Sequence, residues 1–446
     1  MSNTTLTPIP KPAFAEALRF WLKLGFISFG GPAGQIAIMH TVLVEEKRWI
    51  SDAKFLHALN YCMLLPGPEA QQLATYIGWL LHGTRGGLAA GLLFVLPSVF
   101  ILLLLSLLYV TVGTLPALQG VFIGLKPAVV AIIILAMVKI GQKSLLSLLH
   151  YAVAVASFIG IFWLNVPFPL LILGAAAVAL LARRFFPVPT ATAATQARAA
   201  QAEEGYFLTT RSVVAGTGFS AARLLRQVVA AGVLWGVPLA VFAAVSPDFD
   251  FWRGLSAFFT QAALVTFGGA YAVLPYVAQV SVAKLHWLTQ GQMLDGLALG
   301  ETTPGPLIMV LAFVGFMGGY THFGSSLAFG TLGLLTTTYY TFLPSFVFIL
   351  VGAPLIERTQ HNACLKAVLG IITAAVVGVV LNLAVYLGRA VLFPSGHLDA
   401  TGLHWPSLAW LLVSLVALYR FKVNMILWIG VSAGAGLLAY LLAPFV

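Results

Sequence analysis

The chain has 446 residues, of which 60% are hydrophobic and only 8% are charged, and its mean hydropathy is +0.98. A soluble globular protein carries about 25% charged residues, so this composition excludes a chain whose whole surface faces water. The net charge is +10, and the basic residues that produce it lie between apolar segments, as they do in cytoplasmic loops. They are not clustered with aromatic residues, as they would be on a nucleic-acid-binding face. We therefore predict an all-α polytopic membrane protein that binds no nucleic acid.

The first half of the chain contains six apolar segments. The opening MSNTTLTPIPKP lacks the basic start and the small-residue cleavage site of a signal peptide, so we expect no removable leader. The predicted segments cover residues 13–44, 54–82, 86–111, 116–140, 146–164 and 166–182. Residues 1–182 then form a first transmembrane repeat.

Residues 183–222 are rich in Pro, Ala and Thr and carry arginines, a composition that forms no packed core and predicts a cytoplasmic linker. One extra apolar segment at 223–245 predicts a connecting transmembrane helix. Residues 246–446 form a second unit with six further segments, at 254–282, 292–319, 325–353, 363–388, 405–419 and 423–443.

Landmarks of the first half recur in the second half at a constant offset of 238 residues. They are the Ser-Phe-Gly-Gly run at 28–31 with Thr-Phe-Gly-Gly at 266–269, Trp49 with Trp287, and the Pro-Gly-Pro runs at 66–68 and 304–306. Beyond a small insertion the match continues at an offset of 247, as from Ser98 to Ser345. A register held from residue 28 to residue 130 predicts an internal duplication.

Loop charges predict that the two halves insert with opposite topology. In the first half, basic residues at the start of the third segment and at the ends of the fourth and sixth favour the cytoplasm, whereas the loop at 165–167 is uncharged. In the second half the basic loops fall at 357–366 and 420–422, and the stretch 394–404 has no Lys or Arg. We expect an inner-membrane protein with its N-terminus and linker inside, its C-terminus outside, and an inverted repeat typical of secondary transporters.

Glycine and proline interrupt the first two segments of each half. Such breaks are tolerated at membrane depth only where the backbone lines a cavity or is buried in protein. Each break also starts a new helix, whose first amides and positive dipole end favour an anion. The segments either span the membrane, which gives 13 crossings, or form re-entrant hairpins, which gives nine crossings and four re-entrant elements; the basic loop at 45–54 slightly favours hairpins. Kinking and close packing of membrane helices is the alternative explanation of the breaks.

The paired Phe-Gly-Gly and Pro-Gly-Pro pattern in both halves resembles the chromate ion transporter family in its long two-domain form. Its most specific stretches are 29–35 and 65–72 in the first half and 266–271 and 301–306 in the second. The resemblance covers nearly the whole chain outside the linker. It implies export of chromate from the cytoplasm, which gives resistance, with sulfate as the look-alike anion.

The residues themselves predict a site for one small oxyanion among the four breaks. A tetrahedral dianion needs several N–H or O–H donors and some positive charge. Lys126 lies within an apolar segment and is the candidate cation, with a structural pair to Glu69 or Glu301 as the alternative. The expected substrate-binding residues are Ser28, Gly30, Gly31, Gln35, Pro66, Gly67, Pro68, Gln71, Gln72, Lys126, Thr266, Gly268, Gly269, Tyr271, Thr302, Thr303, Pro304, Gly305 and Pro306.

Glu69 and Glu301 flank the two Pro-Gly-Pro runs and are predicted to carry the protons that couple anion movement to a proton gradient. The alternative role is a dipole partner at a helix N-terminus; Asp295 is a weaker candidate for proton coupling. With only Cys62 and Cys364 and no cluster at metal-ligand spacing, we expect no metal, cofactor or disulfide framework. The absence of catalytic and nucleotide-binding motifs disfavours a membrane enzyme.

These observations predict a secondary active transporter that exports chromate by alternating access, driven by protons or by exchange with a counter-anion. The alternative is a carrier or channel for sulfate, another oxyanion or an organic anion on the same scaffold. The lipid bilayer is its setting, and a homodimer is compatible with the sequence.

Overall fold

The computed structural model describes residues 10–442 apart from positions 30, 114, 183–202, 204, 211, 213–220, 247, 360–362, 398 and 400, and the side chains of 221 and 353–367. The first half contains α1 (Phe14–Ile27), α2 (Gly31–His40), η1 (Thr41–Glu46), α3 (Asp52–Cys62), α4 (Glu69–Val112), α5 (Pro116–Ser144), α6 (Leu148–Phe162) and α7 (Phe168–Ala182). The connecting helix is α9 (Ala221–Val245). The second half contains α10 (Phe249–Leu264), α11 (Ala270–Gln279), η2 (Val280–Lys284), α12 (Gln290–Thr302), η3 (Leu307–Met309), α13 (Val310–His322), α14 (Leu327–Thr359), α15 (Ala363–Leu392), α16 (Trp405–Tyr419) and α17 (Met425–Leu442).

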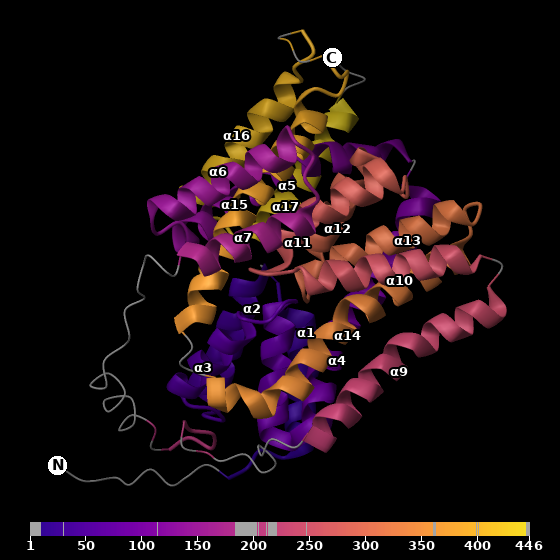
Figure 1. The fold of residues 1–446 in the computed structure, drawn as a ribbon. Coiled ribbons are helices and arrows are strands. Elements are labelled where there is room, and N and C mark those ends of the chain that lie inside the picture. The colour runs from indigo at the N-terminus through magenta and orange to yellow at the C-terminus, as the bar shows by residue number, and fades with distance from the viewer. Residues whose placement is uncertain are drawn as a thin grey trace.

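Six described helices, namely α4, α5, α9, α14, α15 and α17, are long and apolar enough to cross a membrane. They confirm the prediction of an all-α polytopic membrane protein. Helices α6, α7 and α16 have 15 residues each, or about 22 Å at 1.5 Å per residue, which is less than a hydrocarbon core of about 30 Å. The connecting helix α9 runs along the outside of the bundle (Figure 1), and its apolar side chains are largely exposed, as expected for a surface in contact with lipid.

Helix α4 joins two predicted segments across a sharp kink. His82 and Gly83 leave the helical conformation, and Gly83 adopts a φ of 63°, in the left-handed region that glycine reaches without strain. The His82 Nε2 atom lies 2.9 Å from the carbonyl oxygen of Pro12, which precedes α1. The end of the second predicted segment therefore lies beside the start of the first.

The broken segments form hairpins whose two ends lie together. Lys47, after η1, places its Nζ atom 2.6 Å from Oε1 of Glu16 in the first turn of α1. In the second half the ring of Phe251 near the start of α10 packs against that of Trp287, after η2, with centroids 5.9 Å apart. Thr321 near the end of α13 donates its hydroxyl to the Trp287 carbonyl oxygen at 3.1 Å. A chain that enters and leaves at one end favours the re-entrant arrangement over the spanning one.

The backbone conformation repeats at matched positions of the two halves. Each first hairpin ends in a π-helical turn, η1 or η2. Arg48 and His286, which are 238 residues apart, both adopt a left-handed φ, of 50° and 51°. Because an arginine and a histidine have no shared preference for that conformation, the match supports the predicted duplication independently of residue identity.

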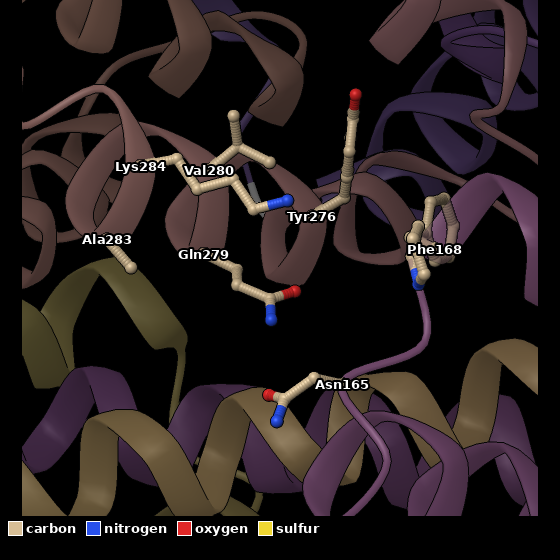
Figure 2. Close-up of a pocket in the computed structure, with 8 residues that line it drawn as sticks. Asn165, Phe168, Tyr276, Gln279, Val280, Ala283 and Lys284 are labelled. Carbon is tan, nitrogen blue, oxygen red and sulfur yellow. The ribbon is translucent and has the colours of Figure 1, made fainter.

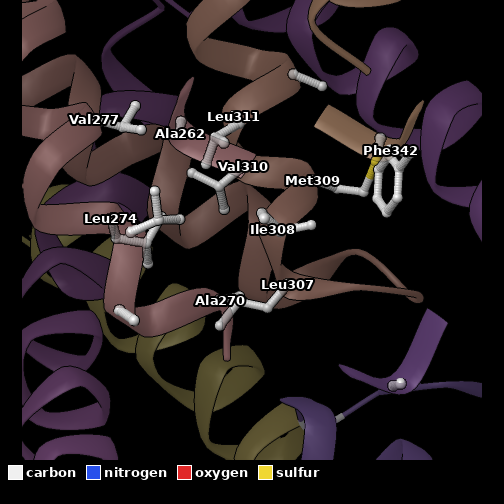
Figure 3. Packing of buried hydrophobic residues seen from close by; sticks show 14 of the residues in the cluster. Ala262, Ala270, Leu274, Val277, Leu307, Ile308, Met309, Val310, Leu311 and Phe342 are labelled. Carbon is white, nitrogen blue, oxygen red and sulfur yellow. The ribbon is translucent and has the colours of Figure 1, made fainter. Parts of the chain in front are cut away.

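The core of the second half forms where its hairpins meet α13 and α14. Figure 3 shows apolar side chains of α10, α11, η3 and α13 packed side by side; Leu274, Ile308 and Val310 are fully buried. Glycines allow the helices to approach, since a Cβ at Gly315 of α13 would overlap the Thr337 side chain of α14. Close van der Waals packing of this kind holds helices together in lipid, where the hydrophobic effect between them is weak. The broken segments of the second half are thus packed closely against α13 and α14.

Part of the linker is docked on the first repeat, contrary to the expectation that its composition gives no packed structure. Leu208 forms a parallel backbone bridge with Ile50. The carboxylate of Glu203 is buried and accepts hydrogen bonds from the Ser51 hydroxyl at 2.8 Å and the Thr210 amide at 3.0 Å. A few specific contacts therefore fix residue 203 and residues 205–210, and the linker positions 183–202, 204, 211 and 213–220 lie outside the described residues.

Opposite insertion of the hairpins is tested by thiol labelling of two matched positions. Lys47 and Leu285 are 238 residues apart and both follow a π-helical turn. In a chain with Cys62→Ala and Cys364→Ala, a membrane-impermeant thiol reagent is expected to label Lys47→Cys only from the cytoplasmic side and Leu285→Cys only from the outside. Labelling of both from one side would rule out inverted repeats, and labelling of Lys47→Cys from outside would indicate spanning segments.

Candidate functional site

Each Pro-Gly-Pro turn is hydrogen-bonded to the broken helix of the opposite repeat. The Gly67 amide donates to the Thr266 carbonyl oxygen at 2.8 Å, and the Gly305 amide donates to the Ser28 carbonyl oxygen at 2.6 Å. Gly67 matches Gly305 and Ser28 matches Thr266 at the same offset, so the two hydrogen bonds are equivalent contacts of the two repeats. This cross-repeat pair brings together predicted site residues from four separate stretches of the chain.

Two serines of the neighbouring long helices lie against the turns, and one of them is hydrogen-bonded to its turn. Ser98 of α4 donates its hydroxyl to the Pro304 carbonyl oxygen, and Ser345 of α14 is the nearest side chain to a Cβ built on Gly67. Gly67 and Gly305 adopt φ values of 126° and 101°, which disfavour any other residue. In the sequence these serines are only repeat landmarks, and their shared register predicts that they occupy equivalent positions in the two halves.

The predicted glutamines also hold backbone. Gln35 donates from Nε2 to the Gly305 carbonyl oxygen at 2.5 Å, and Gln72 donates to that of Pro66 at 2.7 Å. Gln71 donates to the Thr75 hydroxyl at 3.0 Å. All three glutamine side chains are buried. Their amide donors therefore shape the turns in this structure, and they are less available to a bound anion than the sequence suggested.

Most of the predicted hydroxyl donors are occupied as well. Thr266 donates to the carbonyl oxygen one helical turn earlier, and Thr302 and Thr303 both donate to that of Leu299. The hydroxyl of Ser28 is fully buried and has no hydrogen-bond partner among the residues that the structure describes. Ser28 is therefore the hydroxyl best placed to donate to an additional group.

The first turns of α2 and α11 lie close together and leave room for an added atom at Gly31 and Gly269. A Cβ built on Gly31 would meet no atom within 4 Å, and one built on Gly269 would meet only Oε1 of Glu69 and Cγ of Pro32, each at 4.0 Å. Both glycines are buried and have positive φ values, of 73° and 95°. In the described part of the chain, the amides of residues 268–271 donate to no backbone carbonyl. Gly30, the remaining predicted member of this break, lies outside the described residues.

Both predicted proton-carrying carboxylates converge on the start of α11. Glu69, from the first repeat, faces Gly269, and Glu301, from α12, accepts a hydrogen bond from the Tyr271 hydroxyl at 2.8 Å. The side chain of Glu301 is only 5% exposed. Negative charge is favoured at a helix N-terminus by its unpaired amides and dipole. The two carboxylates therefore lie at the second-repeat break, as an asymmetric site would require.

The remaining side of this break is formed by α15. Thr373 lies against Gly268, with Cγ2 3.3 Å from a Cβ built there. Thr373 is the repeat equivalent of Lys126 at the offset of 247. A neutral hydroxyl thus stands in the second repeat where the first carries an ammonium group.

Lys126 is paired with Asp295, not with Glu69 or Glu301 as the alternative prediction proposed. The Lys126 Nζ atom lies 3.3 Å from Oδ1 of Asp295, and the Tyr109 hydroxyl donates to Oδ2 at 2.9 Å. The pair joins α5 to α12 across the repeats. The sequence does not predict Asp295 as the partner of Lys126, because the way α12 is rotated against α5 leaves no periodic pattern in the sequence.

The prolines act through the backbone. Pro68 and Pro306 directly precede α4 and η3 with φ values of −75° and −64°, and Pro32 is the second residue of α2. A fixed φ in this range suits a helix start, where the missing donor costs nothing. Pro66 and Pro304 contribute the carbonyl acceptors described above. No group of three His, Cys, Asp or Glu side chains within the described ranges could hold a metal ion.

Two adjoining cavities, of about 290 and 400 Å³, lie further along α11. They share Asn165, Gln279 and Ala283, and Figure 2 shows the first of them. None of the predicted site residues lines either cavity.

A polytopic helical protein with broken helices buried at its centre has the form of a membrane transport protein. The chromate transporter family model matches residues 15–180 and 253–437, which correspond to the two predicted repeats. The chain belongs to this family, and the resemblance inferred from its motifs is confirmed.

Several relatives match most of the chain. It is 32% identical over 399 residues to a chromate transport protein of Pseudomonas aeruginosa, covering 85% of this chain and 82% of the relative. It is 28% identical over 390 residues to a probable chromate transport protein of Synechococcus elongatus (87% and 88%), and 27% identical over 384 residues to a chromate transport protein of Cupriavidus metallidurans (85% and 84%). No solved structure matches this chain.

Substitution of a turn glycine tests the cross-repeat contact. In Gly305→Ala the new Cβ would overlap the Ser98 side chain, and the φ of 101° would be strained, at a cost on the order of 1–3 kcal/mol. We expect a lower Tm in detergent and loss of transport. Gly174→Ala in α7 is the matched control, because its Cβ would meet nothing within 4 Å, and it should be neutral or stabilise by up to about 1 kcal/mol. Equal Tm values for the two variants would contradict this role of Gly305.

A double-variant cycle tests the Lys126–Asp295 pair. The side chains are 28% and 9% exposed, so Lys126→Gln or Asp295→Asn alone leaves a mostly buried group without its partner, at a cost of about 1–3 kcal/mol. We expect the double variant to recover most of the Tm and of the chromate flux. Recovery of Tm without flux would instead assign the ammonium group to anion binding.

Proposed function

We propose that this protein is a secondary active transporter that moves chromate out of the cytoplasm by alternating access. Its membership of the chromate transporter family and the names of its relatives support chromate as the substrate. The observation that carries the proposal is the cross-repeat pair of hydrogen bonds, from Gly67 to Thr266 and from Gly305 to Ser28. These bonds join the breaks of both repeats.

The proposed anion site is the space between the first turns of α2 and α11. The amides of residues 268–271 and the Ser28 hydroxyl supply donors without a described acceptor. A dianion there would receive charge-assisted hydrogen bonds, which are about twice as strong as neutral ones, together with the dipoles of two helices. Chromate and sulfate both meet this requirement because both are tetrahedral dianions.

Glu69 couples the anion to a proton in this proposal. Its carboxylate faces Gly269, so a bound dianion would compete with it for the same helix N-terminus. Lys143 of α5 attracts the Glu69 charge, Cys62 of α3 faces it, and Glu301 is a second carboxylate at this helix end. Repulsion between like charges then requires Glu69 to be protonated when the anion binds. Proton and anion bind together.

The membrane potential then supplies the driving force. A dianion that travels with one proton carries one net negative charge. Its exit from a cell with a negative interior is favoured by about 2.3 kcal/mol per 100 mV. Export therefore needs no counter-anion in this scheme.

Asymmetry between the two matched turns provides the two states that alternating access requires. The Ser98 hydroxyl is bonded to the Pro304 carbonyl oxygen, whereas the hydroxyl of its counterpart Ser345 has no partner in the described ranges. In the other state, Ser345 would be hydrogen-bonded to its turn and Ser98 would not. The central site would then open to the opposite side of the membrane. The long helices α4 and α14, which carry the serines, would move with the turns.

Chromate flux in everted membrane vesicles tests the proposal. With a lumen-positive potential, vesicles that contain the protein should accumulate chromate saturably, and sulfate should inhibit. Reversal of the potential should slow the uptake, and vesicles without the protein are the control. Absence of flux with folded protein present would contradict chromate export, and uptake that does not saturate would indicate a channel.

The pH dependence of sulfate inhibition tests the role of Glu69. Sulfate is the probe because it stays a dianion near neutral pH, whereas chromate itself titrates there. Its inhibition constant should fall by up to about tenfold for each unit by which pH is lowered, since one proton binds with the anion. Glu69→Gln should bind sulfate independently of pH, and the surface control Glu16→Gln, whose side chain is 48% exposed, should behave as wild type. A pH dependence retained in Glu69→Gln would refute the coupling.

A further inference from the structure

The two cavities beside α11 are lined by apolar side chains together with cations and amides. Lys284 lines the first cavity and Arg389 the second, while Asn165 and Gln279 line both. In Figure 2 the carboxamides of Gln279 and Asn165 point toward one another across the first cavity, from α11 and from the loop between α6 and α7. Asn382 of α15 adds a third carboxamide to the second cavity.

The charges of this lining are of one sign. No aspartate or glutamate is among the described residues that line either cavity. Neither Lys284 nor Arg389 forms an ion pair within the described part of the chain, in contrast to Lys126 and Lys47. The Arg389 guanidinium lies 6.0 Å from the centroid of the Phe162 ring, a cation–π distance that holds it at the cavity wall. Two unpaired cations with amide donors are the groups that bind an oxyanion.

Two helices lead from the central breaks to these cavities. Helix α11 begins at Ala270 beside the break, and Gln279 lies nine residues further on. On α15, Thr373 contacts Gly268 at the break, and Asn382 lies nine residues further on. Nine residues of helix correspond to about 14 Å. The cavities therefore lie about 14 Å along these helices from the proposed central site.

The cavities lie at the end of the molecule that the loop charges place outside. Residues 165–167 and 394–404 are the stretches predicted to face outward. Asn165 belongs to the first stretch, and Arg389 lies in the last turn of α15, five residues before the second. An anion that leaves the central space toward this end would meet Lys284 and Arg389 before it reaches bulk solvent.

We propose that these cavities form a second, outer binding site for small oxyanion dianions, separate from the helix breaks. Its role as the exit site of the transport path rests on the proposed function, but its chemistry does not. The phosphate of a lipid headgroup carries the same acceptor groups, so the test includes both sources of anion.

Thiol chemistry at Ala283 tests the site without transport. Ala283 is exposed and lines both cavities. In purified protein with Cys62→Ala and Cys364→Ala, the thiol introduced by Ala283→Cys should react about tenfold faster with an anionic than with a cationic methanethiosulfonate, relative to their rates with a free thiol. Sulfate should slow the anionic reagent more than sodium chloride does at equal ionic strength.

Matched charge removals give the controls. Lys284→Gln with Arg389→Gln should abolish the rate ratio and the protection by sulfate. Arg253→Gln with Arg420→Gln removes the same charge from exposed positions outside the cavities and should leave both intact. An unchanged ratio in the first pair, or no protection by sulfate, would overturn the proposal. Protection by phosphatidylglycerol but not by sulfate would overturn it too, and would assign the cavities to a lipid headgroup.

A flux measurement separates this site from the proposed function. In everted vesicles, sulfate in the lumen should inhibit wild-type chromate uptake, and Lys284→Gln with Arg389→Gln should weaken this inhibition about tenfold. If thiol protection holds and the wild-type protein transports no chromate, the proposed function fails while the outer site stands. If flux is normal and sulfate gives no thiol protection, the outer site fails while the proposed function stands.

Discussion

The amides of Gly67 and Gly305 need acceptors that their own turns do not supply. A buried, unpaired backbone group costs several kcal/mol in an apolar medium, so a helix break at membrane depth must find its partner elsewhere. Here each repeat gives the other a carbonyl oxygen, at Thr266 and at Ser28. The close approach of α2 and α11, and the space between their first turns, depend on this exchange. A single repeat by itself would lack the carbonyl oxygen that its turn amide uses here, which gives a physical reason for the duplication.

The same contact allows the two halves to differ. Because the turns are held by backbone bonds, side chains around them could diverge without loss of the fold. Glu69, Glu301 and Thr373 gather at the second-repeat break, while Lys126 is neutralised by Asp295 at a distance from it. A scaffold of two matched halves thus carries an asymmetric set of charges, which agrees with the proposed cycle with one coupled proton.

Much of the fold could be predicted from sequence, but few of its contacts. Apolar runs, the 238-residue register and the Gly and Pro breaks are local signals, and the structure has helices and breaks at those positions. The pairing of Lys126 with Asp295, the use of Gln35 to hold a carbonyl, and the docking of Glu203 on Ser51 depend on how helices rotate and pack. Such contacts lie far apart in the chain and leave no periodic trace. The family resemblance supplied the substrate, which residue spacing alone could not.

The location of bound chromate tests the central claim most directly. Chromium scatters X-rays anomalously, so crystals grown with chromate and measured at its absorption edge would reveal the anion without assumptions about the protein. The account predicts an anomalous peak between Gly31 and Gly269, within hydrogen-bonding reach of the amides at the start of α11. A protein that transports chromate but shows no peak there, with chromium bound only at a site away from the breaks, would contradict it.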